Sequence, residues 1–127
     1  MKINIEHGIP FIEAIFKHNN KEIVVSNVLI DTGAASSIIS VDIALEIGLG
    51  PSPTDIIHRV RGVGGYEYVY EKVIESITAP NIDISNFVVE VGDMDYGFNI
   101  NAILGTDFLR RAKAKIDMEN LTLTLNM

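Results

Sequence analysis

One carboxylate, Asp31, stands at the end of an aliphatic segment in the sequence VLIDTGAASS of residues 28–37. Three aliphatic residues lead into it, and threonine, glycine and other small residues follow. Burying an ionised carboxylate without a partner is costly, so sequences normally place aspartate in solvent or opposite a cation. An ordinary strand-to-turn corner is one explanation, since Asp and Gly favour turns. Proton transfer is the chemistry that such a carboxylate can perform.

Two glycine-containing segments downstream are the other candidates for a site. The sequence RGVGGY at residues 61–66 lies between two β-rich arms, which predicts a hairpin with a glycine tip. Residues 103–105, Ile-Leu-Gly, repeat the pattern of aliphatic residues that end at a small one. These three segments are the ones that could assemble into one site.

Other chemistries fit the sequence less well. The glycines of residues 62–65 could cradle a phosphate, but the Lys-Ser/Thr of a P-loop and the helix of a dinucleotide-binding motif are absent from this segment. Ser36 or Ser37 could act as a nucleophile with a histidine, but no G-x-S-x-G elbow is present. The three histidines lack metal-ligand spacing and are expected at the surface or in turns: His7, His18 and His58.

The elements that must position these residues are mostly strands. Residues 11–16 and 22–30 are predicted to form a hairpin whose second arm ends at Asp31. Other predicted strands lie at residues 2–6, on both sides of the glycine tip within 58–73, over 75–79 and 82–91 with a break at 79–81, over 101–105, and in a C-terminal pair at 113–117 and 121–125.

Two short helices are predicted between these strands. The first covers residues 41–47, with Ser40 as its N-cap and Gly48 placed to end it. The second covers residues 106–112, with Thr106 as its cap.

Residues 24–40 and 87–109 resemble each other, since each runs from a strand to an aliphatic segment, a polar or glycine corner and a helical turn. Such internal symmetry would bring residues 29–33 and 102–106 side by side.

Length, charge and composition limit the number of domains and the kinds of partner and site that the chain can have. The 127 residues fit one domain, 1–127, and the chain carries a formal net charge of −7 without a Lys/Arg cluster. This charge argues against nucleic acid or an anionic membrane surface as a partner. The absence of cysteine excludes a disulfide framework and a thiolate metal site. No signal peptide or membrane-length apolar run is present, so we expect a cytoplasmic protein with no membrane partner.

Together, the D-T-G-A of residues 31–34, the glycine hairpin of 61–66 and the Ile-Leu-Gly of 103–105 resemble the retropepsin-like aspartic proteases in order and spacing. The resemblance runs from Pro10 to Leu125 and is closest to the single-domain cellular and bacterial type. It implies an all-β barrel of hairpins with one or two short helices and a flap hairpin, assembled as a C2 homodimer. Terminal strands would lie in the dimer interface.

The chemistry of this family explains the unusual place of Asp31. Peptide hydrolysis without a metal needs a water between two carboxyl groups, one ionised to take a proton and one protonated to polarise the scissile carbonyl. Two acids held close together cannot both ionise, so they share one proton. Since the chain has one D-T-G and no D-S-G, the second carboxylate is expected from Asp31 of a second molecule.

The resemblance also implies a set of site residues and no metal or cofactor. Within the family the threonine hydroxyl and the amides of the D-T-G turn tie the two copies together. The glycine hairpin is the flap over the substrate, with Val63 and Tyr66 covering the cleft. The implied catalytic residues are Asp31, Thr32 and Gly33, and the implied substrate-binding residues are Ala34, Ala35, Val63, Gly64, Gly65, Tyr66 and Ile103. Tyr66, Tyr68 and Tyr70 share one face of a strand by their spacing, so packing competes with substrate contact for at least two of them.

The sequence departs from the retroviral enzymes at one ion pair. Ala35 and Ser36 stand where those enzymes have two acids, and Thr106 stands where they have an arginine that pairs with the first acid. Both partners are missing together, which puts the usual dimer contacts and substrate main-chain hydrogen bonds in doubt.

Two functions follow from the sequence. The first is a homodimeric aspartic endopeptidase that cleaves an extended peptide or protein substrate lying between flap and floor. The alternative is a retropepsin-like dimerisation or peptide-binding module with little or no turnover, since a fold does not fix a function.

Overall fold

The structure, a computed structural model, describes residues 1–62, 65–95 and 99–125. The strands and helices of these residues are β1 (Asn4–Glu6), β2 (Ile9–His18), β3 (Lys21–Ile30), β4 (Ile38–Ser40), α1 (Val41–Glu46), β5 (Ile57–Gly62), β6 (Gly65–Ala79), β7 (Ile82–Gly92), β8 (Ala102–Leu104), α2 (Thr106–Arg111), β9 (Ala114–Asp117) and β10 (Thr122–Leu125).

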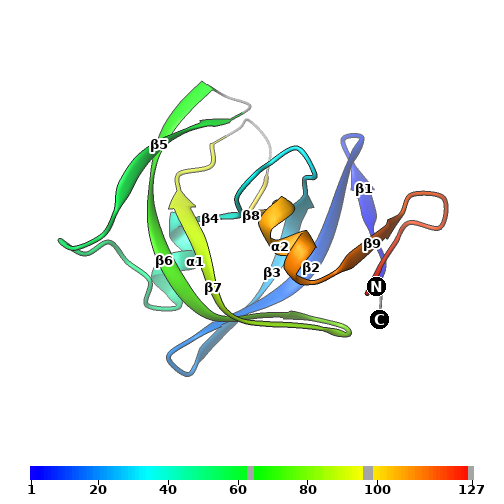
Figure 1. The fold of residues 1–127 in the computed structure, drawn as a ribbon, viewed down its shortest axis with the longest axis horizontal. Coiled ribbons are helices and arrows are strands. Elements are labelled where there is room, and N and C mark those ends of the chain that lie inside the picture. Colours follow the sequence, from blue (N-terminus) through cyan, green and yellow to red (C-terminus); the bar gives the residue numbers. More distant parts are fainter. Residues whose placement is uncertain (63–64, 96–98, 126–127) are drawn as a thin grey trace.

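The strands form one large curled sheet and one small sheet. The large sheet has the order β1-β2-β3-β8-β4-β7-β6-β5, and β2 pairs with β6 as well, so the sheet bends back and pairs with itself. β9 and β10 form a separate antiparallel pair. Figure 1 shows the β5–β6 hairpin at one side of the molecule and β9 with both termini at the other. The predicted all-β architecture with two short helices is confirmed.

The hairpin that leads to Asp31 is confirmed as β2 and β3. Its turn contains Asn19 and Asn20, whose φ angles of 49° and 65° are those that an Asn-rich two-residue turn requires. Along β3, Val25, Val28 and Ile30 are buried, so the strand enters the core as it approaches Asp31. The pattern of apolar residues therefore predicts the strand β3. It also predicts that the chain leaves the core after Ile30, at Asp31.

One predicted break between strands is wrong. The sequence predicted separate strands on either side of residue 74, whereas β6 runs without interruption from Gly65 to Ala79. No turn-forming residue lies between Val73 and Ser76, so the strand has no reason to end there. The chain turns only at Pro80 and Asn81, where Asn81 has a φ of 65°.

The two helices differ in how they begin. α1 begins as predicted, because the Ser40 hydroxyl accepts a hydrogen bond from the Ile43 amide at 3.3 Å, and Gly48 follows it with a φ of 81°. The prediction that Thr106 caps α2 is wrong. The N-cap residue is Gly105, and the Thr106 hydroxyl donates instead to the Ala34 carbonyl at 2.7 Å.

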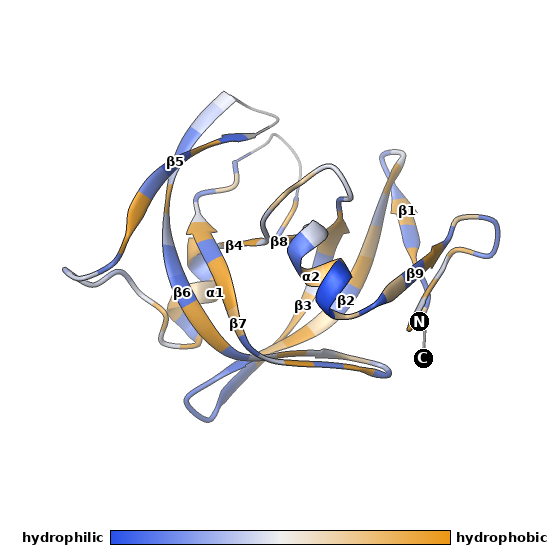
Figure 2. Ribbon diagram, in the orientation of Figure 1, coloured by the Kyte–Doolittle hydropathy of each residue, from blue (hydrophilic) through white to orange (hydrophobic). Residues whose placement is uncertain are grey.

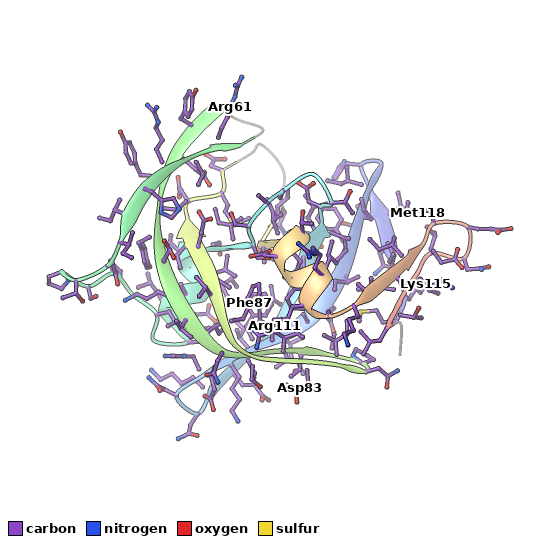
Figure 3. All side chains as sticks on the ribbon, in the orientation of Figure 1. Arg61, Asp83, Phe87, Arg111, Lys115 and Met118 are labelled. Atoms are coloured by element: carbon purple, nitrogen blue, oxygen red, sulfur yellow. The ribbon has the colours of Figure 1, made fainter. Side chains whose placement is uncertain are left out.

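Apolar side chains of the curled sheet and the helices form the core. Phe16, Ile74 and Phe108 are almost wholly buried, and the ring of Phe108 meets Phe87 edge to face at 5.6 Å between centroids. Hydrophobic colour follows β7 and much of β3 in Figure 2. Arg111 lies beside Phe87 in Figure 3, with its guanidinium 5.8 Å from the ring centroid. The core thus holds α2 against β7.

Neither helix of the described residues has the length and apolar character needed to cross a membrane.

Candidate active site

Asp31 follows directly after β3, at the place where β3 meets β8. These strands pair in parallel, with Ile30 opposite Leu104, and the Asp31 amide donates to the Leu104 carbonyl at 3.0 Å. The predicted adjacency of residues 29–33 and 102–106 is therefore confirmed. Asp31 itself is half-buried, whereas Thr32 and Gly33 after it are exposed.

The turn after β3 orients the Asp31 carboxylate. Its Oδ1 accepts a hydrogen bond from the Gly33 amide at 2.9 Å, and its carbonyl accepts one from the Ala34 amide at 3.2 Å. A Cβ atom at residue 33 would lie 3.2 Å from Oδ1 of Asp31. Glycine therefore keeps the side of the carboxylate open.

The start of α2 fastens this turn to the rest of the fold. Both the amide and the hydroxyl of Thr106 donate to the Ala34 carbonyl, each at 2.7 Å. The hydroxyl of Ser37 donates to Asp107 at 2.8 Å and accepts the Gly105 amide at 3.0 Å. Neutral hydrogen bonds and the Asp107 carboxylate thus hold the segment that follows Asp31. This is the place in the fold where Ala35 and Thr106 replace the acid and the arginine of the retroviral enzymes.

Ser37 and Asp107 are the positioning residues that sequence reasoning missed. Ser37 is 1% exposed, so its hydroxyl needs a buried partner, and Asp107 supplies it. Asp107 is not among the sequence-predicted site residues, and its carboxylate holds the segment after Asp31 by accepting hydrogen bonds from the amide and hydroxyl of Ser37. The available signal was an acid in the first turn of a short helix, a place where free amides favour a carboxylate.

A cavity of about 670 Å³ opens beside Asp31. The residues that line it are Asp31, Gly33, Ala34, Ala35, Ser36, Ile38, Val60, Arg61, Glu67, Glu90 and Ile103. Five of the sequence-predicted site residues thus lie together: Asp31, Gly33, Ala34, Ala35 and Ile103. Thr32, Gly65 and Tyr66 do not line the cavity, and Val63 and Gly64 lie outside the described residues.

Comparison with known proteins decides the family. Residues 14–108 match the family model described as aspartyl protease. The chain belongs to the aspartyl protease family. A search of curated proteins found no match.

Two solved structures share the fold of this aspartyl protease family member. A retropepsin-like aspartic protease from Rickettsia conorii superposes with a TM-score of 0.68 at 21% identity, covering 98% of this chain and 97% of that one. The retroviral protease-like domain of Ddi1 from Leishmania major gives a TM-score of 0.66 at 21% identity, covering 93% and 88%. The predicted retropepsin-like fold is confirmed.

The three tyrosines of β6 differ in how far they are packed. Tyr66 and Tyr68 are 63% and 73% exposed, and the guanidinium of Arg59 stacks over the Tyr66 ring at 4.3 Å. Only Tyr70 packs, donating its hydroxyl to the Leu49 carbonyl at 3.0 Å. Burial, and then the charge of Asp55, raise the pKa of Tyr70. Of the two alternatives that the sequence left open, packing therefore applies to Tyr70 and not to Tyr66 or Tyr68.

His58 has partners that the sequence did not predict. From β5 it reaches across β6, with its Nε2 3.1 Å from Oε2 of Glu90 and its Nδ1 3.5 Å from Oε2 of Glu71. Its side chain is 37% exposed, in agreement with a surface position. Within the part of the chain that the structure describes, no group of three potential ligands is arranged to hold a metal ion.

The loop before β5 is tied to β6 by Asp55. Its carboxylate lies 2.7 Å from Nζ of Lys72 and accepts from the amide and hydroxyl of Ser52. The hydrogen bond from Lys72, and then those from Ser52, hold the pKa of Asp55 below its usual value, against the effect of burial. This contact anchors the base of the β5–β6 hairpin.

Replacing Asp55 with asparagine is expected to lower the melting temperature at neutral pH. A depressed carboxyl pKa contributes stability above the ordinary value of 3.8, and that contribution disappears as the pH falls through the lowered pKa of the folded state. The difference in melting temperature between the wild type and Asp55→Asn should therefore shrink as the pH falls below 3.8. Thermal unfolding across a pH series measures it, with Asp83→Asn, at an exposed site on β7, as control. A gap that stays constant with pH would contradict this assignment.

Proposed function

We propose that this chain is a homodimeric aspartic endopeptidase in which Asp31 of each subunit supplies one of two catalytic carboxyl groups. The observation that carries the proposal is the position of Asp31, half-buried on the wall of a cavity and oriented by the Gly33 amide. Family membership supports the chemistry. One subunit has a single D-T-G, so a complete pair requires a second copy.

In this proposal the two carboxyl groups hold a water and share one proton. The ionised carboxyl takes a proton from the water as its oxygen attacks the scissile carbonyl carbon, while the protonated carboxyl gives its proton to the carbonyl oxygen. As the resulting diol collapses, one of its hydroxyl groups gives a proton to the ionised carboxyl, the C–N bond breaks, and the protonated carboxyl gives its proton to the leaving nitrogen. Water and peptide are thus consumed, and the acid pair ends in its starting state.

The surroundings of Asp31 support both the pairing and the binding of an extended peptide. Thr32 and Gly33 are exposed beside it, so a symmetry-related copy can approach this turn. The cavity has the β5–β6 hairpin on one side, through Val60, and the Asp31 turn on the other, through Ala34 and Ala35. A peptide that lies as a strand between them would be held by its main chain, with side chains placed alternately in pockets.

Incubation with an unbiased peptide mixture, from acidic to neutral pH, tests this function. We expect cleavage products, and we expect a transition-state mimic with a central hydroxyl to suppress them, because the hydroxyl takes the place of the attacking water. Cleavage that the mimic does not affect would reject the assignment. Binding of extended peptides without any products would favour the peptide-binding module.

Dimerisation is tested separately by sedimentation over a range of protein concentrations. Specific activity is expected to rise with concentration as monomers associate and to level off when dimers predominate. Full activity from a species that sediments as a monomer would exclude the shared pair.

A further inference from the structure

We infer that His58 is a positioning residue for the proposed peptidase, which in its protonated form clasps the β5–β6 hairpin to β7 beside the cleft. The clasp consists of the contacts of His58 with Glu71 and Glu90, and it holds the hairpin at mildly acidic pH and releases it as the pH rises. This inference rests on the proposed function, because it takes the hairpin as one wall of the peptide-binding cleft.

His58 joins three strands of the large sheet. From β5, its Nε2 lies 3.1 Å from Oε2 of Glu90 on β7, and its Nδ1 lies 3.5 Å from Oε2 of Glu71 on β6. β5 is the last strand of the sheet, and its backbone pairs with β6 (Figure 1). The contact with Glu90 therefore reaches past β6 and ties the outer arm of the hairpin to the body of the sheet.

The position of the two ring nitrogens favours the charged form of His58. Each nitrogen faces a carboxylate oxygen, one of Glu71 and one of Glu90. A neutral imidazole has a single N–H, so its other nitrogen would present a lone pair to a carboxylate. An imidazolium has an N–H on both nitrogens and attracts both carboxylates.

The two glutamates also need a cation between them. Glu71 on β6 lies directly opposite Glu90 on β7, and like charges in such cross-strand pairs are unfavourable. A protonated His58 offsets this repulsion, and a neutral one does not. Loss of the proton therefore weakens the attraction between strands and restores the repulsion at the same time.

Glu67 adds to the negative charge on this face of the hairpin. Val69 is the residue opposite His58, and Glu67 and Glu71 lie two positions on either side of it along β6. Side chains two positions apart on a strand share a face. Protonation of His58 thus takes place among carboxylates from β6 and β7.

The charged neighbours of His58 on its own strand face the other way. Arg59 and Arg61 alternate with His58 along β5, so they belong to the opposite face. Their guanidinium groups lie 4.3 Å and 5.9 Å from the centroid of the Tyr66 ring. These arginines therefore do not take the place of His58 in the clasp.

The remaining elements packed here bring no further cation to Glu71 and Glu90. Lys72 follows Glu71 on β6 but pairs with Asp55 at 2.7 Å. β4 pairs with β7 at Glu90 and has no titratable side chain. Within the strands that the structure describes at this place, His58 is the group whose protonation supplies positive charge to the two glutamates.

The clasp lies at the wall of the cavity beside Asp31. Glu90 lines this cavity from β7, and Val60, two residues after His58 and on the same face of β5, lines it from the hairpin. The Glu90 amide donates to the Ser37 carbonyl at 3.0 Å, in the segment that follows Asp31. A closed clasp therefore holds the hairpin wall of the cleft in a fixed place relative to the Asp31 turn.

The pH range of the clasp follows from the groups that form it. The side chains of His58, Glu71 and Glu90 are 37%, 34% and 11% exposed, so the ring exchanges protons with solvent and water weakens each ion pair. Glutamates are ordinarily ionised above about pH 4.3 and histidines protonated below about pH 6.5. The contribution of the clasp is thus present at mildly acidic pH and is lost as the pH rises and the ring loses its proton.

Hydrogen exchange of the β5 amides tests the clasp without any cleavage. Their protection is measured at about pH 5.5 and about pH 8, corrected for the intrinsic exchange rate at each pH and referred to the amides of β3. In the wild type we expect about threefold higher protection at the lower pH. His58→Gln should remove this difference, because glutamine gains no proton in this range. His58→Arg should keep protection high at both pH values, because a guanidinium stays charged and can donate to both glutamates.

The pH profile of cleavage connects the clasp with the reaction. The ratio of kcat/KM at about pH 5.5 to that at about pH 8 should be about threefold lower in His58→Gln than in the wild type. His58→Arg should restore activity at the lower pH. A residue with a merely structural role would change kcat/KM by the same factor at both pH values.

The control is His7→Asn, which removes another histidine from an exposed turn where a φ of 52° suits asparagine. It should leave the pH dependence of β5 protection unchanged. Circular dichroism confirms that each variant is folded, and His58→Arg tests the clasp independently if His58→Gln is unstable.

Two results separate the clasp from the proposed peptidase. Wild-type protection that does not change with pH, or a change that His58→Gln retains, overturns the inference even if the wild type cleaves peptides. A change with pH that His58→Gln abolishes, in a wild type that cleaves nothing, supports the clasp and rejects the peptidase.

Discussion

Replacing Asp31 with asparagine is expected to lower kcat/KM for peptide cleavage by about a thousandfold or more. Asparagine cannot accept the proton of the attacking water or return it to the leaving nitrogen, and general acid–base catalysis contributes factors of this size. The fold should not change, because the amide oxygen of asparagine can still accept the hydrogen bond from Gly33. Cleavage assays and thermal unfolding of the same preparation measure the two effects. Turnover equal to that of the wild type would end the catalytic role of Asp31.

A mixing experiment with the same variant addresses the shared pair. If each active dimer needs two intact carboxyl groups, an equimolar mixture of freely exchanging wild type and variant leaves about a quarter of the dimers intact. Activity per total protein should then fall to about a quarter of the wild-type value. A fall to about one half would mean that each subunit works independently.

Replacing Gly105 with alanine is expected to destabilise the protein by about 3 kcal/mol, at the upper end of the cost of overpacking. The new Cβ would lie 2.7 Å from the Ala34 carbonyl oxygen and 2.8 Å from that of Ser36. Both are backbone atoms of the Asp31 turn and cannot rotate away. The clash should therefore displace the Asp31 turn and lower the midpoint of denaturant unfolding, and the proposed peptidase activity should be lost with it.

The matched control for this prediction is Gly50→Ala. Its Cβ would meet only a methyl group of Leu45, at 3.2 Å, and the Leu45 side chain is 56% exposed and free to move. We expect a change within about 0.5 kcal/mol, typical of surface substitutions. If the two glycine variants unfold at the same denaturant concentration, the close approach at Gly105 has no energetic importance.

The sequence predicted the elements that depend on local patterns. Alternating apolar residues and the Asn19-Asn20 turn specify the β2–β3 hairpin, and Ser40 specifies the start of α1. The meeting of β3 with β8 was also predicted, from a repeat that places an aliphatic segment before each small corner. For these elements the local sequence pattern was sufficient to predict the structure, because the tertiary contacts favour the same conformation.

The incorrect predictions arise where tertiary contacts override local rules. Thr106 has the side chain of a helix cap, but its hydroxyl bonds to Ala34, a residue 72 positions away. For Tyr66 and Tyr68 the spacing left packing and substrate contact open, and their exposure of 63% and 73% depends on what lies over the hairpin, not on the strand pattern. Glu90 lies in an otherwise aliphatic stretch, and its pairing with His58 depends on strand order, which one sequence does not reveal.

The parallel pairing of β3 with β8 also governs when the site can form during synthesis. Asp31 is made early, but the strand and the helix start that hold its turn are β8 and residues 105–107. Contacts this distant in sequence close late in folding, because a long loop must be ordered first. A nascent chain that has not yet emerged from the ribosome past these residues therefore cannot have an ordered Asp31 turn.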